Sequence, residues 1–180
     1  RILKGKKCAL NSDTGMTAIS DPGEELVKAA YENNITVESV PGPSALITAL
    51  AISGMPSGRF CFEGFLTMNK IGRREHLESL KTEKRTMIFY EAPHKLSATL
   101  QDMLKTFGDR KIALVRELTK LHETVFHTTL SEAIEHYSEN APRGEFVLIV
   151  SGAKEETAVY GMADALKIAN KLIEEGQSTS

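Results

Sequence analysis

An apolar run, a loop and the start of a helix follow one another in Cys8-Ala-Leu-Asn-Ser-Asp-Thr-Gly-Met-Thr-Ala-Ile-Ser-Asp-Pro-Gly-Glu24. The apolar run has the character of a buried strand, and apolar residues recur at the spacing of one helix face after Glu24. The loop between them is rich in Gly and Asp. In an open α/β sheet, a loop at the carboxyl end of a strand is the usual place for a small ligand. We therefore expect a ligand site at residues 12–23.

The elements that follow predict an α/β fold. A strand over Ile35–Val40 and a helix over Ala45–Ser53 complete a strand-helix-strand-helix order, which is typical of a parallel sheet. Beyond the Gly- and Pro-rich segment 54–58, two strands without a helix between them indicate an antiparallel pair within a mixed sheet. We expect strands at 60–65, 86–90, 111–115, 122–127 and 145–150, and helices at 24–32, 73–80, 93–107, 131–137 and 163–175.

These patterns divide the chain into three parts. We expect a partial parallel-sheet domain over residues 1–57, a second α/β domain with a mixed sheet of about five strands over 58–153, and a helical tail over 154–180. The chain has 180 residues, of which 41% are hydrophobic, and a formal net charge of −2. This composition predicts a globular protein of the cytoplasm with no membrane segment, and it argues against a chain that coats nucleic acid through its overall charge. Cys8 and Cys61 are expected to be buried free thiols.

Several motifs allow both a functional and a structural interpretation. The glycines of the first loop leave backbone N–H groups open to a ligand, but Asp13 and Asp21 also suit turns and caps. Ser44, after Pro41-Gly-Pro43, can cap a helix or contact a ligand. Two clusters of polar residues follow strands, and each can be catalytic or a solvated, salt-bridged loop: Phe89-Tyr-Glu-Ala-Pro-His94 and Arg116-Glu-Leu-Thr-Lys120.

Two further motifs bear on metal and on nucleic acid. His122 and His127 are five residues apart in a strand-like segment, whereas a zinc site on a helix requires a separation of four, so we predict no metal site. The most basic stretch is Lys70-Ile-Gly-Arg-Arg-Glu-His76. Basic side chains of this kind hold phosphate backbones, although a solvated helix face is the commoner explanation.

Six motifs occur in the order and spacing of one family: Ser12-Asp-Thr-Gly…Ala-Ile-Ser-Asp-Pro-Gly23, Pro-Gly-Pro-Ser-Ala45, Phe-Glu-Gly-Phe-Leu66, Phe-Tyr-Glu-Ala-Pro-His-Lys95, Arg-Glu-Leu-Thr-Lys120 and Gly-Glu-Phe-Val-Leu148. From near Leu3 to Gly152, the chain resembles the ribosomal RNA small subunit methyltransferase I group of the tetrapyrrole (corrin/porphyrin) methylase superfamily.

The resemblance implies a two-domain, tetrapyrrole-methylase-like enzyme that binds S-adenosylmethionine between its domains. It would transfer the methyl group to the 2′-hydroxyl of a cytidine in small-subunit (16S) rRNA, without a metal and as a homodimer. By the same resemblance, the cofactor would be bordered by Asp13, Gly15, Met16, Thr17, Ser44, Ala45, Tyr90, Arg116 and Thr119. The RNA contacts expected from the basic stretch and the turn after residue 90 are Arg73, Arg74 and His94.

Removal of the 2′-hydroxyl proton calls for a base, and the chemistry leaves Glu117, Glu91 and His94 open as candidates. Lys120 is the candidate for stabilising the developing alkoxide or for orienting a phosphate. We therefore take Glu117, Lys120 and Glu91 as the expected catalytic residues.

The chain departs from the family at two points. It has Met16-Thr17 where the family usually has Thr-Pro, and it lacks the first strand of the family together with the glycine loop that follows that strand. We therefore expect an N-terminally truncated piece of a longer protein. Two alternatives stay open: a methylase of the same superfamily that acts on a tetrapyrrole or another small molecule, and a catalytically silent fragment that only dimerises.

Overall fold

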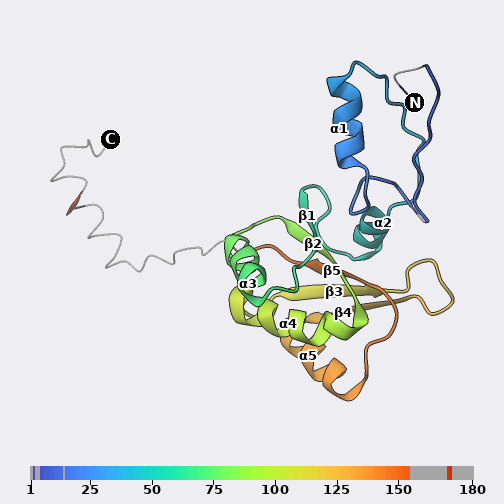
Figure 1. Ribbon diagram of the computed structural model, residues 1–180. Coiled ribbons are helices and arrows are strands. Elements are labelled where there is room, and N and C mark those ends of the chain that lie inside the picture. Colours follow the sequence, from blue (N-terminus) through green and yellow to red (C-terminus); the bar gives the residue numbers. More distant parts are fainter. Residues whose placement is uncertain (1, 3–4, 14, 155–169, 172–180) are drawn as a thin grey trace.

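The computed structural model describes residues 2, 5–13, 15–154 and 170–171. Its elements are α1 (Glu24–Glu32), α2 (Ala45–Ile52), β1 (Phe60–Phe65), α3 (Lys70–Ser79), β2 (Thr86–Glu91), α4 (Pro93–Phe107), β3 (Lys111–Arg116), β4 (Thr124–Thr129), α5 (Leu130–Glu139) and β5 (Phe146–Val150). Figure 1 shows a central sheet with α2 on one side and α3, α4 and α5 on the other.

The sheet has five strands in the order β1-β2-β5-β3-β4. β1 and β2 are parallel, while β5 is antiparallel to both β2 and β3, and β3 is antiparallel to β4. The expected mixed sheet with an antiparallel pair is therefore confirmed. Because β1, β2 and β3 run in the same direction, their last residues, Phe65, Glu91 and Arg116, lie along one edge of the sheet. We call it the carboxyl edge.

Alternation along the strands divides the core between the two faces of the sheet. Met87, Phe89 and Leu148 face α3, α4 and α5 and belong to the larger apolar cluster. Ile88 and Ile149 face the other way and pack against α2. The short helix α2 thus buries one sheet face, and its first turn lies near the carboxyl edge.

Two of the expected strands are absent. Residues 7–10 and 35–40 have no regular secondary structure and are not paired into any sheet of the described residues. Leu10 is 45% exposed and Val40 86% exposed, and the intervening helix α1 buries none of its residues. Strand formation needs hydrogen bonds from a neighbouring strand, which a local apolar pattern cannot supply.

Other expectations are confirmed or corrected in detail. α4 has the expected bounds, and Gly108 ends it with a φ of 74°. β4 begins at Thr124 rather than at His122. Cys8 is exposed rather than buried, while Cys61 is half-buried, and both thiols are free. Most of the helix expected at 163–175 lies outside the described residues.

Two features are absent from the part of the chain that the structure describes. No helix among the described residues has the length and apolar character needed to cross a membrane. The same residues contain no group of three or more His, Cys, Asp or Glu that could hold a metal ion.

Candidate functional site

The carboxyl edge brings together motifs that are distant in the sequence. Glu91 at the end of β2 and Arg116 at the end of β3 are both in register with Phe146 at the start of β5. The turn after β2, the loop after β3 and the segment before β5 therefore leave the sheet side by side. These are three of the six sequence motifs.

Tyr90 joins this edge to helix α2. Its hydroxyl accepts a hydrogen bond of 3.1 Å from the backbone N–H of Leu46, in the first turn of α2. Its ring packs against Phe62 and Phe65 at centroid distances of 5.0 and 5.5 Å. Burial raises the pKa of the Tyr90 phenol, so the hydroxyl stays protonated at neutral pH.

Tyr90 thus performs the capping role that the sequence assigns to Ser44. The Ser44 side chain makes no capping hydrogen bond, although its backbone has the extended conformation of an N-cap residue. Its carbonyl accepts from the Thr48 N–H at 3.0 Å, which starts the helix in the normal way. The Ser44 hydroxyl therefore has no part in holding the first turn of α2.

The first loop reaches the same place through a backbone contact. The Met16 N–H donates to the Pro43 carbonyl at 2.9 Å. Gly15 has a φ of 76°, and a Cβ on it would lie 3.1 Å from the Pro43 oxygen, so the close approach of the two segments requires glycine at this position. Two hydrogen bonds, from Met16 to Pro43 and from Leu46 to Tyr90, therefore connect the first loop, the start of α2 and the carboxyl edge.

The loop after β3 is held by three charged residues that we call the Glu117 clamp: Glu117, Lys120 and Glu145. The Glu117 Oε1 accepts from the Glu145 backbone N–H at 2.9 Å and from Lys120 Nζ at 3.1 Å. Lys120 Nζ also donates to Glu145 Oε2 at 2.8 Å. The hydrogen bond from the Glu145 N–H, followed by that from Lys120, lowers the pKa of Glu117, and the two carboxylates raise the pKa of Lys120. At neutral pH both groups are therefore charged.

The clamp sits on strained backbone. Glu117 and Thr119 have φ values of 51° and 63°, in the left-handed region that residues other than glycine rarely occupy. Such conformations persist where surrounding contacts enforce them, and they concentrate at functional sites. Thr119 is fixed through its N–H, which donates to the Glu123 carboxylate, and Arg116 donates to Thr124 Oγ1 at 3.2 Å.

Gly144 is a site residue that the sequence analysis missed. Its φ is 80°, and a Cβ on it would lie 2.5 Å from the Glu117 side chain. Gly144 therefore makes room for the clamp. The available signal was a glycine directly before the expected strand at 145–150, two residues ahead of β5 in the structure, because a glycine near a strand often marks a close backbone approach.

Glu91 is buried, with 3% of its surface exposed. Its Oε1 accepts from the Ala92 N–H at 2.9 Å and its Oε2 accepts from Thr99 Oγ1 at 2.5 Å. Both carboxyl oxygens are therefore engaged within the protein, where they hold the start of α4.

Comparisons with known proteins identify the family. Residues 1–134 match the family described as Tetrapyrrole (Corrin/Porphyrin) Methylases. The chain belongs to this methylase family.

Related proteins share one name. Over 151 residues, this methylase family member is 48% identical to the Ribosomal RNA small subunit methyltransferase I of Thermotoga maritima, a match that covers 84% of this chain and 68% of that protein. The protein of the same name from a Synechocystis species is 48% identical over 157 residues, covering 87% of this chain and 56% of that protein. The chain thus spans between 56% and 68% of the length of these two relatives.

Solved methylase structures share the fold. A cobalt precorrin-4 methyltransferase of cobalamin biosynthesis aligns with a TM-score of 0.57 at 16% identity, over 77% of this chain and 61% of that one. The methyltransferase CobJ aligns with a TM-score of 0.58 at 21% identity, over 77% and 62% of the two chains. The expected tetrapyrrole-methylase-like α/β fold is confirmed.

Of the residues expected to contact RNA in this member of the methylase family, Arg73 and Arg74 are neighbours on α3, whereas His94 lies on α4. Arg73 is 14% exposed and forms an ion pair of 2.5 Å with Asp102 of α4. Arg74 is exposed beside the groove between α3 and α4. His94 is exposed in the first turn of α4, directly after the carboxyl edge.

We predict that Tyr90→Phe weakens the connection between the edge and α2. Loss of the hydroxyl leaves the Leu46 N–H without its acceptor, which should lower the free energy of unfolding by about 1 kcal/mol. Urea denaturation measures this change. Tyr31→Phe is the matched control because Tyr31 is 64% exposed on α1. Equal effects of the two substitutions would contradict a capping role for Tyr90.

Proposed function

We propose that this chain carries the methyl-transfer region of an S-adenosylmethionine-dependent enzyme that methylates the 2′-hydroxyl of a cytidine in small-subunit rRNA. One observation carries the proposal: two hydrogen bonds link the first loop, the start of α2 and the carboxyl edge. The name shared by the relatives, Ribosomal RNA small subunit methyltransferase I, supports RNA as the substrate class.

The residues at this junction fit the cofactor. Gly15 and Gly42 lie against each other without side chains, so backbone groups are open to a ligand there. We propose that the cofactor is held by the residues expected from the sequence: Asp13, Gly15, Met16, Thr17, Ser44, Ala45, Tyr90, Arg116 and Thr119. When bound, S-adenosylmethionine supplies an activated methyl group on a sulfonium sulfur.

The chain's own residues would orient the substrate oxygen and stabilise its charge. The ribose 2′-oxygen must attack in line with the bond that breaks, so positioning is the main contribution of the protein. Lys120 is a cation at the carboxyl edge and is suited to stabilise negative charge that develops on this oxygen. The lowered pKa of Glu117 makes it a weak base, and we propose that it acts by positioning Lys120.

We assign Glu91 a positioning role as well, because both of its oxygens are engaged and it fixes the turn that leads to His94. His94 is exposed at the carboxyl edge and stays a candidate for receiving the 2′-hydroxyl proton. We further propose a homodimer in the cytoplasm, where ribosomal subunits are found. The same proposal includes the three parts expected from the sequence: a cofactor-binding domain over residues 1–57, a second α/β domain over 58–153 and a helical tail over 154–180.

The function can be tested in a chimera of full length, in which this chain replaces the aligned 151 residues of the Thermotoga maritima relative. With radiolabelled S-adenosylmethionine, we expect methyl incorporation into small ribosomal subunits that lack this modification, and a 2′-O-methylcytidine in their digests. Incorporation into uroporphyrinogen or a precorrin instead would support the small-molecule alternative. No heat of S-adenosylmethionine binding and no transfer would support a silent fragment.

A further inference from the structure

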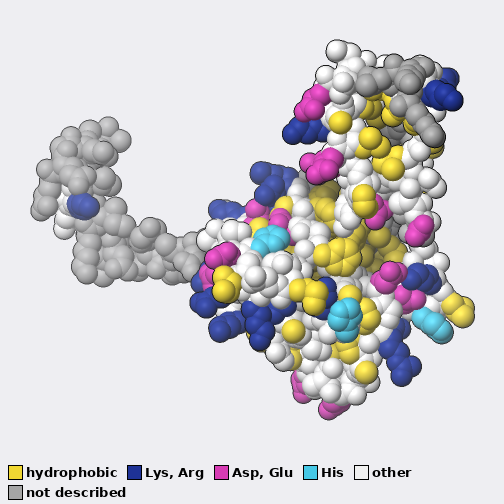
Figure 2. Space-filling view, viewed as in Figure 1, with side chains coloured by type: hydrophobic (Ala, Val, Ile, Leu, Met, Phe, Trp, Pro, Cys, Tyr) yellow, Lys and Arg dark blue, Asp and Glu magenta, His cyan; other side chains and the backbone are white. Residues whose placement is uncertain are grey.

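A groove of about 410 Å³ runs between α3 and α4. It is lined by four basic residues, Lys70, Arg73, Arg74 and Lys105, and by two carboxylates, Glu78 and Asp102. Figure 2 shows Lys and Arg side chains gathered on this part of the surface, although the whole chain has a formal net charge of −2. The positive charge is therefore a local feature of the groove.

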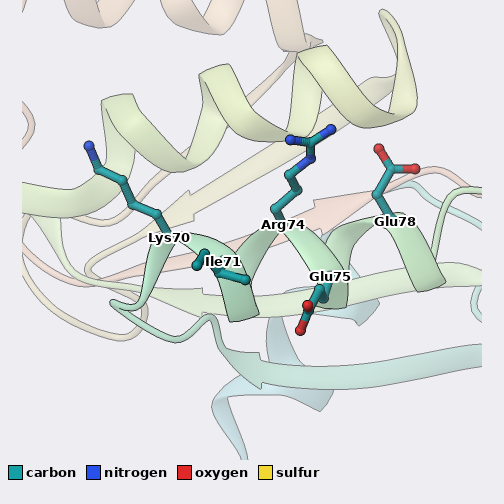
Figure 3. Close-up of a pocket in the computed structure, with 5 residues that line it drawn as sticks. All are labelled: Lys70, Ile71, Arg74, Glu75 and Glu78. Carbon is teal, nitrogen blue, oxygen red and sulfur yellow. The ribbon is translucent and has the colours of Figure 1, made fainter.

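Three of the basic residues are available to a ligand. Lys70, Arg74 and Lys105 are exposed, and none of them forms an ion pair with another described residue. The two carboxylates of the groove are already engaged: Asp102 pairs with Arg73 at 2.5 Å, and Glu78 with Lys81 at 3.8 Å. Figure 3 shows Lys70 and Arg74 extending from α3 toward α4, while Glu75 points away from α4.

One end of the groove points toward the carboxyl edge, on the sheet face opposite α2 (Figure 1). α3 and α4 follow β1 and β2, so both helices start at the carboxyl edge and extend away from it. Lys70 is the first residue of α3, whereas Lys105 lies in the last turn of α4. From Ala98 to Thr106 the α4 wall is about 12 Å long, which corresponds to three or four phosphates of a helical strand at roughly 3.4 Å each.

Two exposed apolar side chains lie close in sequence to Lys70, although they do not line the groove itself. Met68 is 73% exposed and Ile71 is 72% exposed, on either side of Lys70. Nucleic-acid surfaces combine cations for the phosphates with apolar groups for sugars and bases. A groove with cations that form no ion pair with a described residue suits a polyanion.

We infer that the α3–α4 groove binds the phosphate backbone of the RNA substrate and leads the target nucleotide to the carboxyl edge. This inference rests on the proposed function. Lys70, Arg74 and Lys105 make the phosphate contacts, and Arg73 serves mainly to hold α3 against α4 through Asp102. The inference keeps Arg74 from the expected RNA contacts Arg73, Arg74 and His94, and adds Lys70 and Lys105.

The test measures binding of a fluorescently labelled small-subunit rRNA transcript by anisotropy, at salt concentrations between 50 and 200 mM. The groove variant is the chimera with Lys70→Gln, Arg74→Gln and Lys105→Gln. We expect a Kd about tenfold higher at low salt and a salt slope that is smaller by about 2 to 3, because each lost phosphate contact removes one unit or slightly less. The control carries Lys7→Gln, Lys28→Gln and Lys111→Gln, which change exposed lysines elsewhere by the same total charge.

The outcomes separate this inference from the proposed function. The inference is supported if the control binds RNA more tightly than the groove variant does, while both show the same heat of S-adenosylmethionine binding. Equal losses of RNA affinity in the two variants would overturn the groove and indicate a general charge effect. If the unsubstituted chimera methylates rRNA and the groove variant does so with an unchanged KM for RNA, the inference fails while the proposed function stands.

Discussion

Replacing Glu91 by Ala should lower the free energy of unfolding by about 3 kcal/mol. The substitution removes a buried side chain and leaves the Ala92 N–H and the Thr99 hydroxyl without their acceptor. Each unsatisfied buried donor costs about 1 to 3 kcal/mol, and the cavity adds to the loss. Denaturant unfolding followed by circular dichroism measures the change.

Thr99→Val is the matched control for this prediction. It removes the other partner of the 2.5 Å hydrogen bond with little change in volume, so the loss should be smaller, about 1 kcal/mol. In a double-mutant cycle the two losses should not add, because the residues share one interaction. If Glu91→Ala kept its stability but abolished methyl transfer, Glu91 would instead be a catalytic residue.

Gly144→Ala should disrupt the Glu117 clamp. A methyl group at this position meets the Glu117 side chain at 2.5 Å, and the φ of 80° is unfavourable for alanine. We expect a stability loss of about 2 kcal/mol from the left-handed backbone and the displaced side chain. We also expect kcat of the chimera to fall at least tenfold, which corresponds to about 1.4 kcal/mol of transition-state stabilisation, because Lys120 loses one of its carboxylates.

Gly108→Ala provides the control for backbone conformation alone. Gly108 has a similar φ of 74°, but a Cβ there would meet nothing within 4 Å. Because its ψ is −172°, a conformation that is essentially restricted to glycine, the substitution should cost about 2 kcal/mol of stability and leave kcat unchanged. A further comparison, Glu117→Gln, separates the two roles of Glu117: a base would lose nearly all turnover, whereas a positioning residue retains its amide oxygen as an acceptor and should lose much less. Unchanged kcat in Gly144→Ala would show that the clamp has no role in transfer.

Local sequence signals predicted most of the second half of the fold. Pro93 and Gly108 mark the ends of α4, and an apolar run gives β5 to within a residue. The strands expected at residues 7–10 and 35–40 did not form, because pairing depends on a neighbour that local patterning does not supply. The same limit applies to β5, because no local pattern indicates that it lies between β2 and β3 in the sheet.

The site was predictable in its motifs but not in its contacts. Polar residues after strands indicated Tyr90 and the loop that follows Arg116, and the structure brings both to the carboxyl edge. Tyr90 caps α2 from 44 positions away, so the expectation that Ser44 performs this task could not be corrected from local sequence. Gly144 acquires its importance only when the folded chain brings it against Glu117.

The central position of β5 in the sheet has a consequence for folding of the protein during its synthesis on the ribosome. Among the strands that the structure describes, Phe146–Val150 is synthesised last, yet in their sheet order it alone links the β1–β2 pair to the β3–β4 hairpin. Until Val150 has left the ribosome, the β1–β2 pair and the β3–β4 hairpin therefore each expose an unpaired strand edge and apolar surface. Both must avoid contacts with other proteins during that time. Contacts this distant in sequence slow the final closure, so newly made chains are most vulnerable to aggregation just before that moment.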